Sequence, residues 1–226
     1  KKYSAMEDKE MKIKSYLIII AVVFISLYGC ESCYYNAMEK IGIHKRDILV
    51  DRVKEARETQ DETKKQFVTA LEQFKSVVVF EGGNLEKEYK KLNATFEKSE
   101  KKAAEVRERV KAVEKVSEAL FSEWRDEIKQ YSNDALRRSS QRKYDVTRKK
   151  YTELIRAMKK AEAKLEPALA PLRDQVLFMK HNLNAKAIAG LSAEVVKVQA
   201  NVDKLVKEME AAITQADSFI KALQEE

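Results

Sequence analysis

Apolar residues recur at alternating spacings of four and three along most of this chain, beginning at Leu49. An α-helix with that repeat presents its apolar side chains along one seam, which another helix must cover. Four seams can be followed, over residues 49–77, 89–128, 144–172 and 195–223. The residues of the first seam are Leu49, Val53, Ala56, Gln60, Thr63, Phe67, Ala70, Phe74 and Val77. The repeat therefore predicts packed helices and no sheet.

Turn signals separate the seams. Segment 81–84 contains two Gly followed by Asn84, and segment 132–134 reads Ser-Asn-Asp, so each can end one helix and cap the next. Short connections of this kind make neighbouring helices antiparallel. The expected helices span 46–80, 85–131, 134–181 and 193–224, about 50, 70, 70 and 50 Å in length. The predicted fold class is all-α, an elongated antiparallel helical bundle or coiled coil with four long helices.

The composition agrees with long helices. Charged residues make up 36% of the 226 residues, whereas Gly and Pro number only 5 and 2. A turn-rich sandwich or barrel needs more of both, and a disulfide scaffold needs more than the 2 Cys present. A rod whose seams contain many Ala, Ser and Thr buries modest area, so a partner or a homodimer is expected to add stability.

Pro167 and Pro171 interrupt the third predicted helix. Proline lacks the backbone donor and clashes with the preceding turn, and the four-residue spacing indicates one kink. The alternative is that Pro167 starts a new helix, although Glu166 is a poor N-cap. Segment 181–191 then reads either as a polar contact site or as a capped crossover with Ile188 and Leu191 as apolar anchors.

The N-terminal region has the pattern of an export signal. Lys12 and Lys14 precede an apolar run over 16–28, and Gly29 and Cys30 follow it. The run is shorter than the roughly 20 residues that span a bilayer. Met11 is a better start than Lys1. The expected organisation is an extension and signal peptide over 1–29, a lipid-anchored linker over 30–45, and an elongated helical domain over 46–226.

Residues 27–30, Leu-Tyr-Gly-Cys, resemble a bacterial lipobox. The resemblance implies cleavage between Gly29 and Cys30 and a diacylglyceryl group on Cys30. Because Glu31 follows, it also implies the periplasmic face of the outer membrane. The alternative is a plain cleaved signal with an incidental Cys. Cys33 completes a C-x-x-C pattern with no second pair for zinc and no His for haem attachment.

A basic segment lies in the third predicted helix. Residues 135–164 contain eleven basic and three acidic residues, a net charge of +8. The segment is either a solvated helix face or a contact for an anionic surface such as phospholipid headgroups. Nucleic acid is excluded as a partner because the export signal removes the chain from the cytoplasm. The candidate contact residues are Arg137, Arg138, Arg142, Lys143, Arg148, Lys149 and Lys150.

No catalytic constellation can be identified in the sequence. The two His, His44 and His181, lie in different segments, and the Gly residues build no phosphate-binding loop. The carboxylates occupy charged helix faces, where solvation is the rule. We therefore expect no enzyme activity, no cofactor, no metal and no small-molecule substrate.

The chain from about residue 30 to its end resembles an uncharacterised family of Gram-negative predicted lipoproteins with a coiled-coil helical mature domain. The resemblance rests on the opening from Gly29 to Val53, on Ala119-Leu-Phe-Ser-Glu-Trp124, and on the segment from Arg173 to Asn184. It implies a location and a single domain and supplies no activity. Two hypotheses follow: a lipid-anchored envelope scaffold or tether, or a curvature-module-like protein that binds or shapes anionic membranes through its basic helix.

Overall fold

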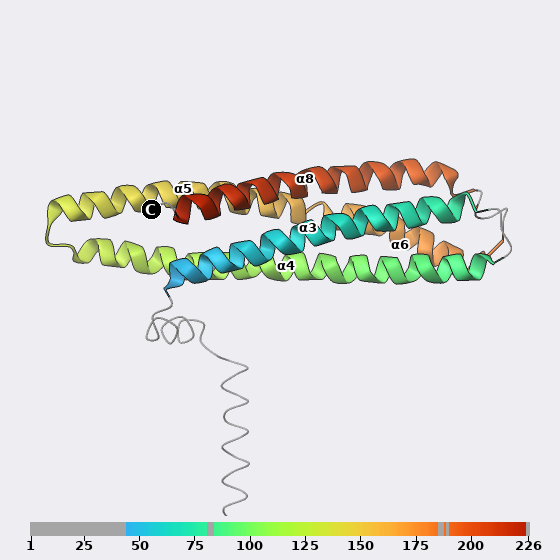
Figure 1. Cartoon of the computed structure of the whole chain (residues 1–226), viewed down its shortest axis with the longest axis horizontal. Helices are drawn as coiled ribbons and strands as arrows, with labels where there is room; N and C mark the ends of the chain where they lie inside the picture. The colour runs from blue at the N-terminus through green and yellow to red at the C-terminus, as the bar shows by residue number, and fades with distance from the viewer. Residues whose placement is uncertain (1–43, 81–83, 185–187, 189, 225–226) are drawn as a thin grey trace, which may run out of the picture. The chain divides into compact units, whose positions relative to one another are not determined.

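The structure, a computed structural model, describes residues 44–80, 84–184, 188 and 190–224. These ranges contain helices and no strand, and residues 46–226 belong to one compact unit. The all-helical prediction is confirmed, with boundaries within two residues of those expected except at the proline segment. The helices are α3 (Lys45–Val78), α4 (Leu85–Gln130), α5 (Asp134–Glu162), α6 (Leu165–His181) and α8 (Ser192–Gln224) (Figure 1).

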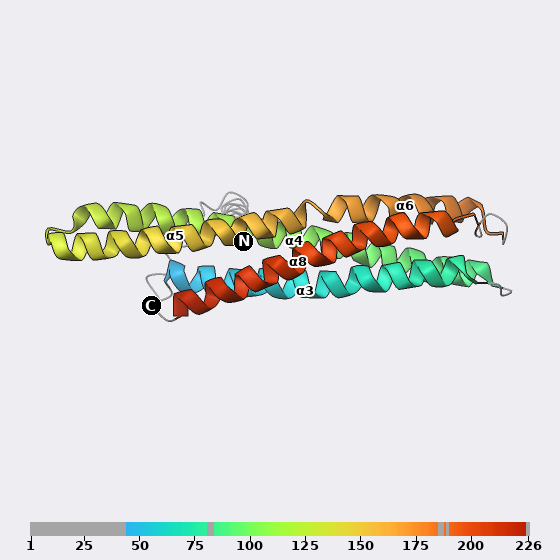
Figure 2. The ribbon, with the colours of Figure 1, turned by 90° about the horizontal axis from the view of Figure 1, so that it is seen from above.

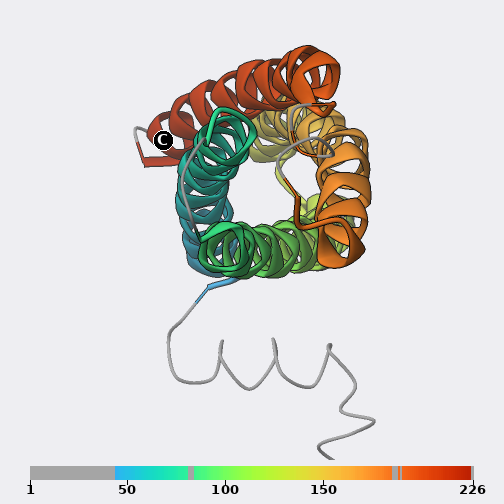
Figure 3. The same cartoon turned by 90° about the vertical axis from the view of Figure 1, so that its right-hand side faces the viewer.

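Within this unit the helices lie side by side in four columns, and successive columns run in opposite directions (Figures 1 and 2). The columns are α3, α4, α5 together with α6, and α8. Helix α6 continues the line of α5, and α8 returns beside both of them. Viewed end-on, α3 lies between α4 and α8, and the α5–α6 column lies on the opposite side (Figure 3). Polar contacts join the columns: Gln66 Nε2 of α3 donates to the Thr95 carbonyl of α4 at 3.0 Å, and Arg57 of α3 pairs with Asp217 of α8 at 2.5 Å.

The predicted seams form the core of the bundle. All nine residues of the first seam are buried, and Phe67 and Phe74 have 0% exposure. Burying a side chain of that size stabilises a fold by about 1.5–3 kcal/mol. The third seam runs without interruption from α5 into α6, where Ala161 and Leu165 are both fully buried. The heptad pattern therefore located the buried face of every helix.

Two asparagines cap helices as the sequence predicted. The Asn84 side chain accepts a hydrogen bond from the Lys87 backbone at 2.9 Å, at the start of α4. Asn133 accepts from the backbone of Ala135 at 2.9 Å and of Leu136 at 3.2 Å, at the start of α5. Each cap satisfies backbone donors that the first helical turn leaves without partners.

The predicted kink at Pro167 and Pro171 is not confirmed, since the third helix bends by only 13°. The helix instead stops at residue 162 and restarts at 165. The break puts Pro167 in the first turn of α6, where a backbone donor has no helical partner, so its absence costs little. Pro171 lies inside α6. A new helix therefore begins two residues before Pro167, close to the alternative that Pro167 starts one.

The segment after α6 matches the crossover interpretation. Helix α6 ends at His181, and Asn182 follows it as C-cap. Ile188 is 2% exposed and Leu191 is 6% exposed, so both predicted anchors are buried.

The α4–α5 hairpin extends past the start of α3 and the end of α8 (Figures 1 and 2). Its outermost part, residues 125–142, is called the hairpin tip below. The predicted basic residues begin in this tip and continue along α5.

Candidate functional site: the basic face of α5 and the cleft beside it

The predicted contact residues of α5 lie on its surface. All seven side chains are exposed. Arg137 forms an ion pair with Asp134 one turn earlier. The other predicted members form no ion pair with any residue that the structure describes. The predicted lipidation and cleavage residues, Cys30 and Gly29, lie outside the described residues, as does Cys33.

Basic residues on α3 and α4 are mostly paired. Lys65 pairs with Asp61 at 2.6 Å within α3, and Lys90 pairs with Glu86 at 2.6 Å within α4. Lys102 joins α4 to α3 through Glu62 at 2.7 Å. Helix α5 therefore differs from α3 and α4, because fewer of its basic side chains form ion pairs within the described ranges.

The uncompensated charge of α5 faces away from the core. Arg138, Arg142, Lys149 and Arg156 follow one another at spacings of four, seven and seven residues, which places them on one side of a helix. All four are exposed, and none forms an ion pair within the described ranges. We call this set the basic face of α5.

Two apolar side chains are exposed in the hairpin tip. Tyr131 is 39% exposed and Leu136 is 55% exposed, close in sequence to Arg137 and Arg138. Exposed aliphatic and aromatic groups next to Arg are suited to the boundary between water and lipid headgroups.

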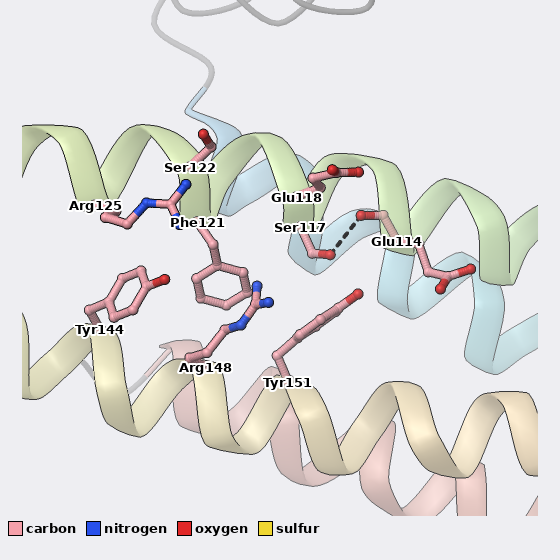
Figure 4. Close-up of a pocket in the computed structure, with 9 residues that line it drawn as sticks. All are labelled: Glu114, Ser117, Glu118, Phe121, Ser122, Arg125, Tyr144, Arg148 and Tyr151. Atoms are coloured by element: carbon pink, nitrogen blue, oxygen red, sulfur yellow. Dashed lines mark hydrogen bonds between the residues drawn. The ribbon is translucent and has the colours of Figure 1, made fainter.

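A cleft of about 360 Å³ lies between α4 and α5 (Figure 4). It opens beside the aromatic core of the hairpin. Its lining residues are Glu114, Ser117, Glu118, Phe121, Ser122 and Arg125 from α4, and Tyr144, Arg148 and Tyr151 from α5.

Aromatic rings form the floor of the cleft. The Phe121 ring lies 5.7 Å from Tyr144 in an edge-to-face arrangement and 5.4 Å from Tyr151. The Arg148 guanidinium carbon lies 4.7 Å from the centroid of Phe121 and 5.7 Å from that of Tyr151. Figure 4 shows this guanidinium between the two rings. Cation–π attraction therefore holds a positive group inside the cleft.

Hydroxyl groups line the same cleft. Ser117 Oγ donates to the Glu114 carbonyl at 2.7 Å and faces the Tyr151 side chain. Burial raises the pKa of the Tyr151 phenol, a shift that the hydrogen bond with Ser117 partly offsets. The phenol is therefore protonated at neutral pH and can donate or accept a hydrogen bond.

The remaining charged residues of the cleft, Glu114, Glu118 and Arg125, all belong to α4. Glu114 pairs with Lys159 of α5. Arg125 and Glu118 are exposed and form no ion pair with the described residues. Figure 4 shows Arg125 directed along α4 towards Ser122. The sequence analysis named Arg148 as a candidate contact for an anionic surface. It missed Arg125 and the cleft, because a heptad repeat does not say which side chains meet in a groove.

No group of three or more His, Cys, Asp or Glu in the described residues is arranged to hold a metal ion. None of the helices in the described ranges combines the length and apolar character needed to cross a membrane.

Comparison with known proteins gives a family and no activity. Residues 34–223 match the family described as protein of unknown function (DUF2959). A comparison with functionally curated proteins found no match.

Proposed function

The chain belongs to that family, and from the geometry above we propose that it is a lipid-anchored structural and interaction protein of the cell envelope. In this proposal Cys30 carries the lipid, at the periplasmic face of the outer membrane. The helical bundle acts as a scaffold or tether and performs no catalysis. The basic face of α5 is its contact surface for an acidic envelope partner.

One observation carries the proposal: the basic face of α5 has four exposed cations without local ion pairs, while the core beneath it is already packed. Within the described ranges, its four side chains form no ion pair with other residues of the bundle. A surface of one sign attracts a partner of the opposite sign and steers its approach.

A second candidate partner is the anionic surface of a bilayer. The exposed Tyr131 and Leu136 beside Arg137 and Arg138 favour it, since a lipid contact combines apolar and cationic groups. Each basic side chain near such a surface contributes about 1 kcal/mol, and salt screens it. We propose membrane binding here and not membrane shaping. Shaping would need a crescent-shaped bundle, and the third helix bends by only 13°.

The anchor is tested by replacing Cys30. Cells that express the full chain or its Cys30→Ser variant are fractionated after a high-salt wash. The proposal expects the wild type to stay with the outer membrane and the variant to be released. Equal retention of both would contradict lipidation as the anchor.

The contact surface is tested by cross-linking from two positions in intact cells. A photoreactive residue at position 142 reports on the basic face of α5, and one at position 69 reports on an exposed site of α3. The proposal expects a specific adduct from 142 that is lost when Arg138, Lys149 and Arg156 become Gln. The same adducts from both positions would contradict it.

A further inference from the structure

The cleft between α4 and α5 contains two guanidinium groups that no carboxylate neutralises among the described residues. Arg148 enters from α5 and is stacked on Phe121 at 4.7 Å. Arg125 enters from α4 and points towards Ser122 (Figure 4). Both residues are exposed, so solvent or a ligand can reach them.

We propose that this cleft binds a phosphate ester that also carries an amino or hydroxyl group. A carboxylate has two oxygens, which one guanidinium can fill in a bidentate pair. A phosphate monoester has three terminal oxygens and can accept from guanidinium groups on both walls. The hydroxyls of Ser122 and Tyr144 line the same cleft and can supply further donors.

The acidic residues of the cleft indicate why the ligand should carry an amino or hydroxyl group in addition to its phosphate. Glu114 is already paired with Lys159, whereas Glu118 forms no ion pair with the described residues. A free carboxylate near the phosphate would repel it unless the same ligand places an ammonium or hydroxyl donor against that carboxylate. Soluble phosphate monoesters fit this description. Phospholipid headgroups fit it as well, because their phosphodiester keeps two terminal oxygens, one for each guanidinium.

The size and rigidity of the cleft agree with a small ligand. Its volume of about 360 Å³ lies at the lower end of the range for small-molecule sites. Arg148 is fixed by two aromatic rings before any ligand arrives, so binding loses less side-chain entropy than it would with a free Arg. The raised pKa of Tyr151 keeps that hydroxyl protonated.

The chain contains its own reporter for this cleft. Trp124 is the single tryptophan, and its ring lies 5.7 Å from the Tyr144 ring that lines the cleft. Purified full-length chain is titrated with O-phosphoethanolamine at constant ionic strength, and Trp124 emission and heat are recorded. We expect saturable binding, at least tenfold weaker binding of inorganic phosphate, and no binding of ethanolamine alone.

Substitutions separate the roles of the two walls. Arg125→Gln is expected to weaken O-phosphoethanolamine binding at least tenfold, and it removes no aromatic contact. Glu118→Gln removes the carboxylate that would bind the ammonium group. The affinity for O-phosphoethanolamine is therefore expected to fall to that for inorganic phosphate. Lys101→Gln removes the same charge from an exposed position of α4 outside the cleft and is expected to leave both affinities unchanged. Circular dichroism confirms that each variant is folded.

Vesicles identify the source of the ester. Vesicles of phosphatidylethanolamine that change Trp124 emission in the wild type but not in Arg125→Gln support the proposal and indicate a lipid headgroup. A response to the soluble ester alone supports it and indicates a soluble ligand. A signal that does not saturate, or equal affinities in wild type and Arg125→Gln, overturns it. The proposal does not rest on the proposed function, because the four residues of the basic face of α5 do not line the cleft.

Discussion

Trp124 Nε1 donates a hydrogen bond to Ser140 Oγ at 2.9 Å and so joins α4 to α5 across the hairpin. The same indole packs edge-on against Tyr144 at 5.7 Å. These contacts join α4 to α5 next to the hairpin tip.

The first prediction concerns this bond. Ser140→Ala removes its acceptor and leaves the indole N–H without a protein partner, so the free energy of unfolding should fall by about 1 kcal/mol. The emission of Trp124 should shift to longer wavelength as the indole becomes more hydrated. Ser139→Ala, one residue earlier, serves as control and should change neither quantity. Unaltered emission in Ser140→Ala would show that the bond is absent in solution.

The second prediction concerns a buried amide in α3. Gln60 has 0% exposure, and neither of its side-chain polar atoms has a hydrogen-bond partner in the described part of the chain. A buried amide without partners costs about 1–3 kcal/mol. Gln60→Met keeps the shape and removes the polar atoms, so denaturant unfolding should show higher stability by that amount.

Gln66 provides the matched control for Gln60. Its Nε2 donates to the Thr95 carbonyl at 3.0 Å and to Ser99 Oγ at 3.2 Å. Gln66→Met should therefore lower stability by about 1 kcal/mol. If both substitutions destabilise equally, Gln60 has partners in solution that the structure does not contain.

The sequence predicted the helices, their buried faces and their caps because each depends on local pattern. The heptad at Phe67 and Phe74 fixes a buried stripe, and Asn133 caps whatever helix follows it. The break before Leu165 was not predicted, because a proline allows either a kink or a restart and nothing local decides between them.

The cleft could not be predicted for a different reason. It depends on which residues of α4 and α5 lie opposite each other, and a heptad repeat allows several registers. Stacking of Arg148 on Phe121 joins residues 27 positions apart in sequence, and only the hairpin brings them together. The charge of α5 was visible in the sequence, but the pairing of Lys159 and Lys160 with Glu114 and Glu208 was not.

The third prediction concerns pH. The hydrogen bond from Arg173, 2.9 Å from the Glu166 carboxylate, lowers the pKa of that carboxyl below its ordinary value of 4.5. A lowered pKa in the folded state gives stability that is present above 4.5 and is lost as the pH falls through the folded-state value. Wild type should therefore be more stable than Glu166→Gln at pH 7, and the difference should shrink below 4.5.

Thermal unfolding followed by circular dichroism across the acid range measures this difference. Asp174→Asn is the control, because Asp174 lies next to Arg173 and forms no ion pair within the described ranges. Its difference from wild type should stay small at every pH. A gap between wild type and Glu166→Gln that does not change with pH would rule out the ion pair as its source.

The fourth prediction concerns the dimensions of the bundle. Helix α4 has 46 residues, which correspond to about 69 Å at 1.5 Å per residue. A compact domain of the same size would have a radius of gyration of about 16 Å. Small-angle scattering from monodisperse, detergent-solubilised chain should give a clearly larger value and a maximum dimension of at least the α4 length. A value near that of the compact domain would contradict the bundle.

The basic face of α5 can be separated from net charge by two matched variants. One replaces Arg138, Arg142, Lys149 and Arg156 with Gln. The other replaces Lys54, Lys65, Lys90 and Lys197, which form ion pairs with acidic residues one turn away. Both lose four positive charges, but only the first loses the basic face. Each variant also carries Cys30→Ser, so that the proposed lipid anchor does not keep the chain on the membrane.

The central claim is tested most directly by binding of these chains to isolated envelope membranes at low and high salt. The account predicts that the non-acylated chain and the Lys variant bind at low salt, that the α5 variant loses most of this binding, and that salt removes the difference. Vesicles of extracted lipid, run in parallel, separate a lipid surface from a protein partner. Equal binding of the two variants at low salt would contradict the account and leave α5 as a solvated helix.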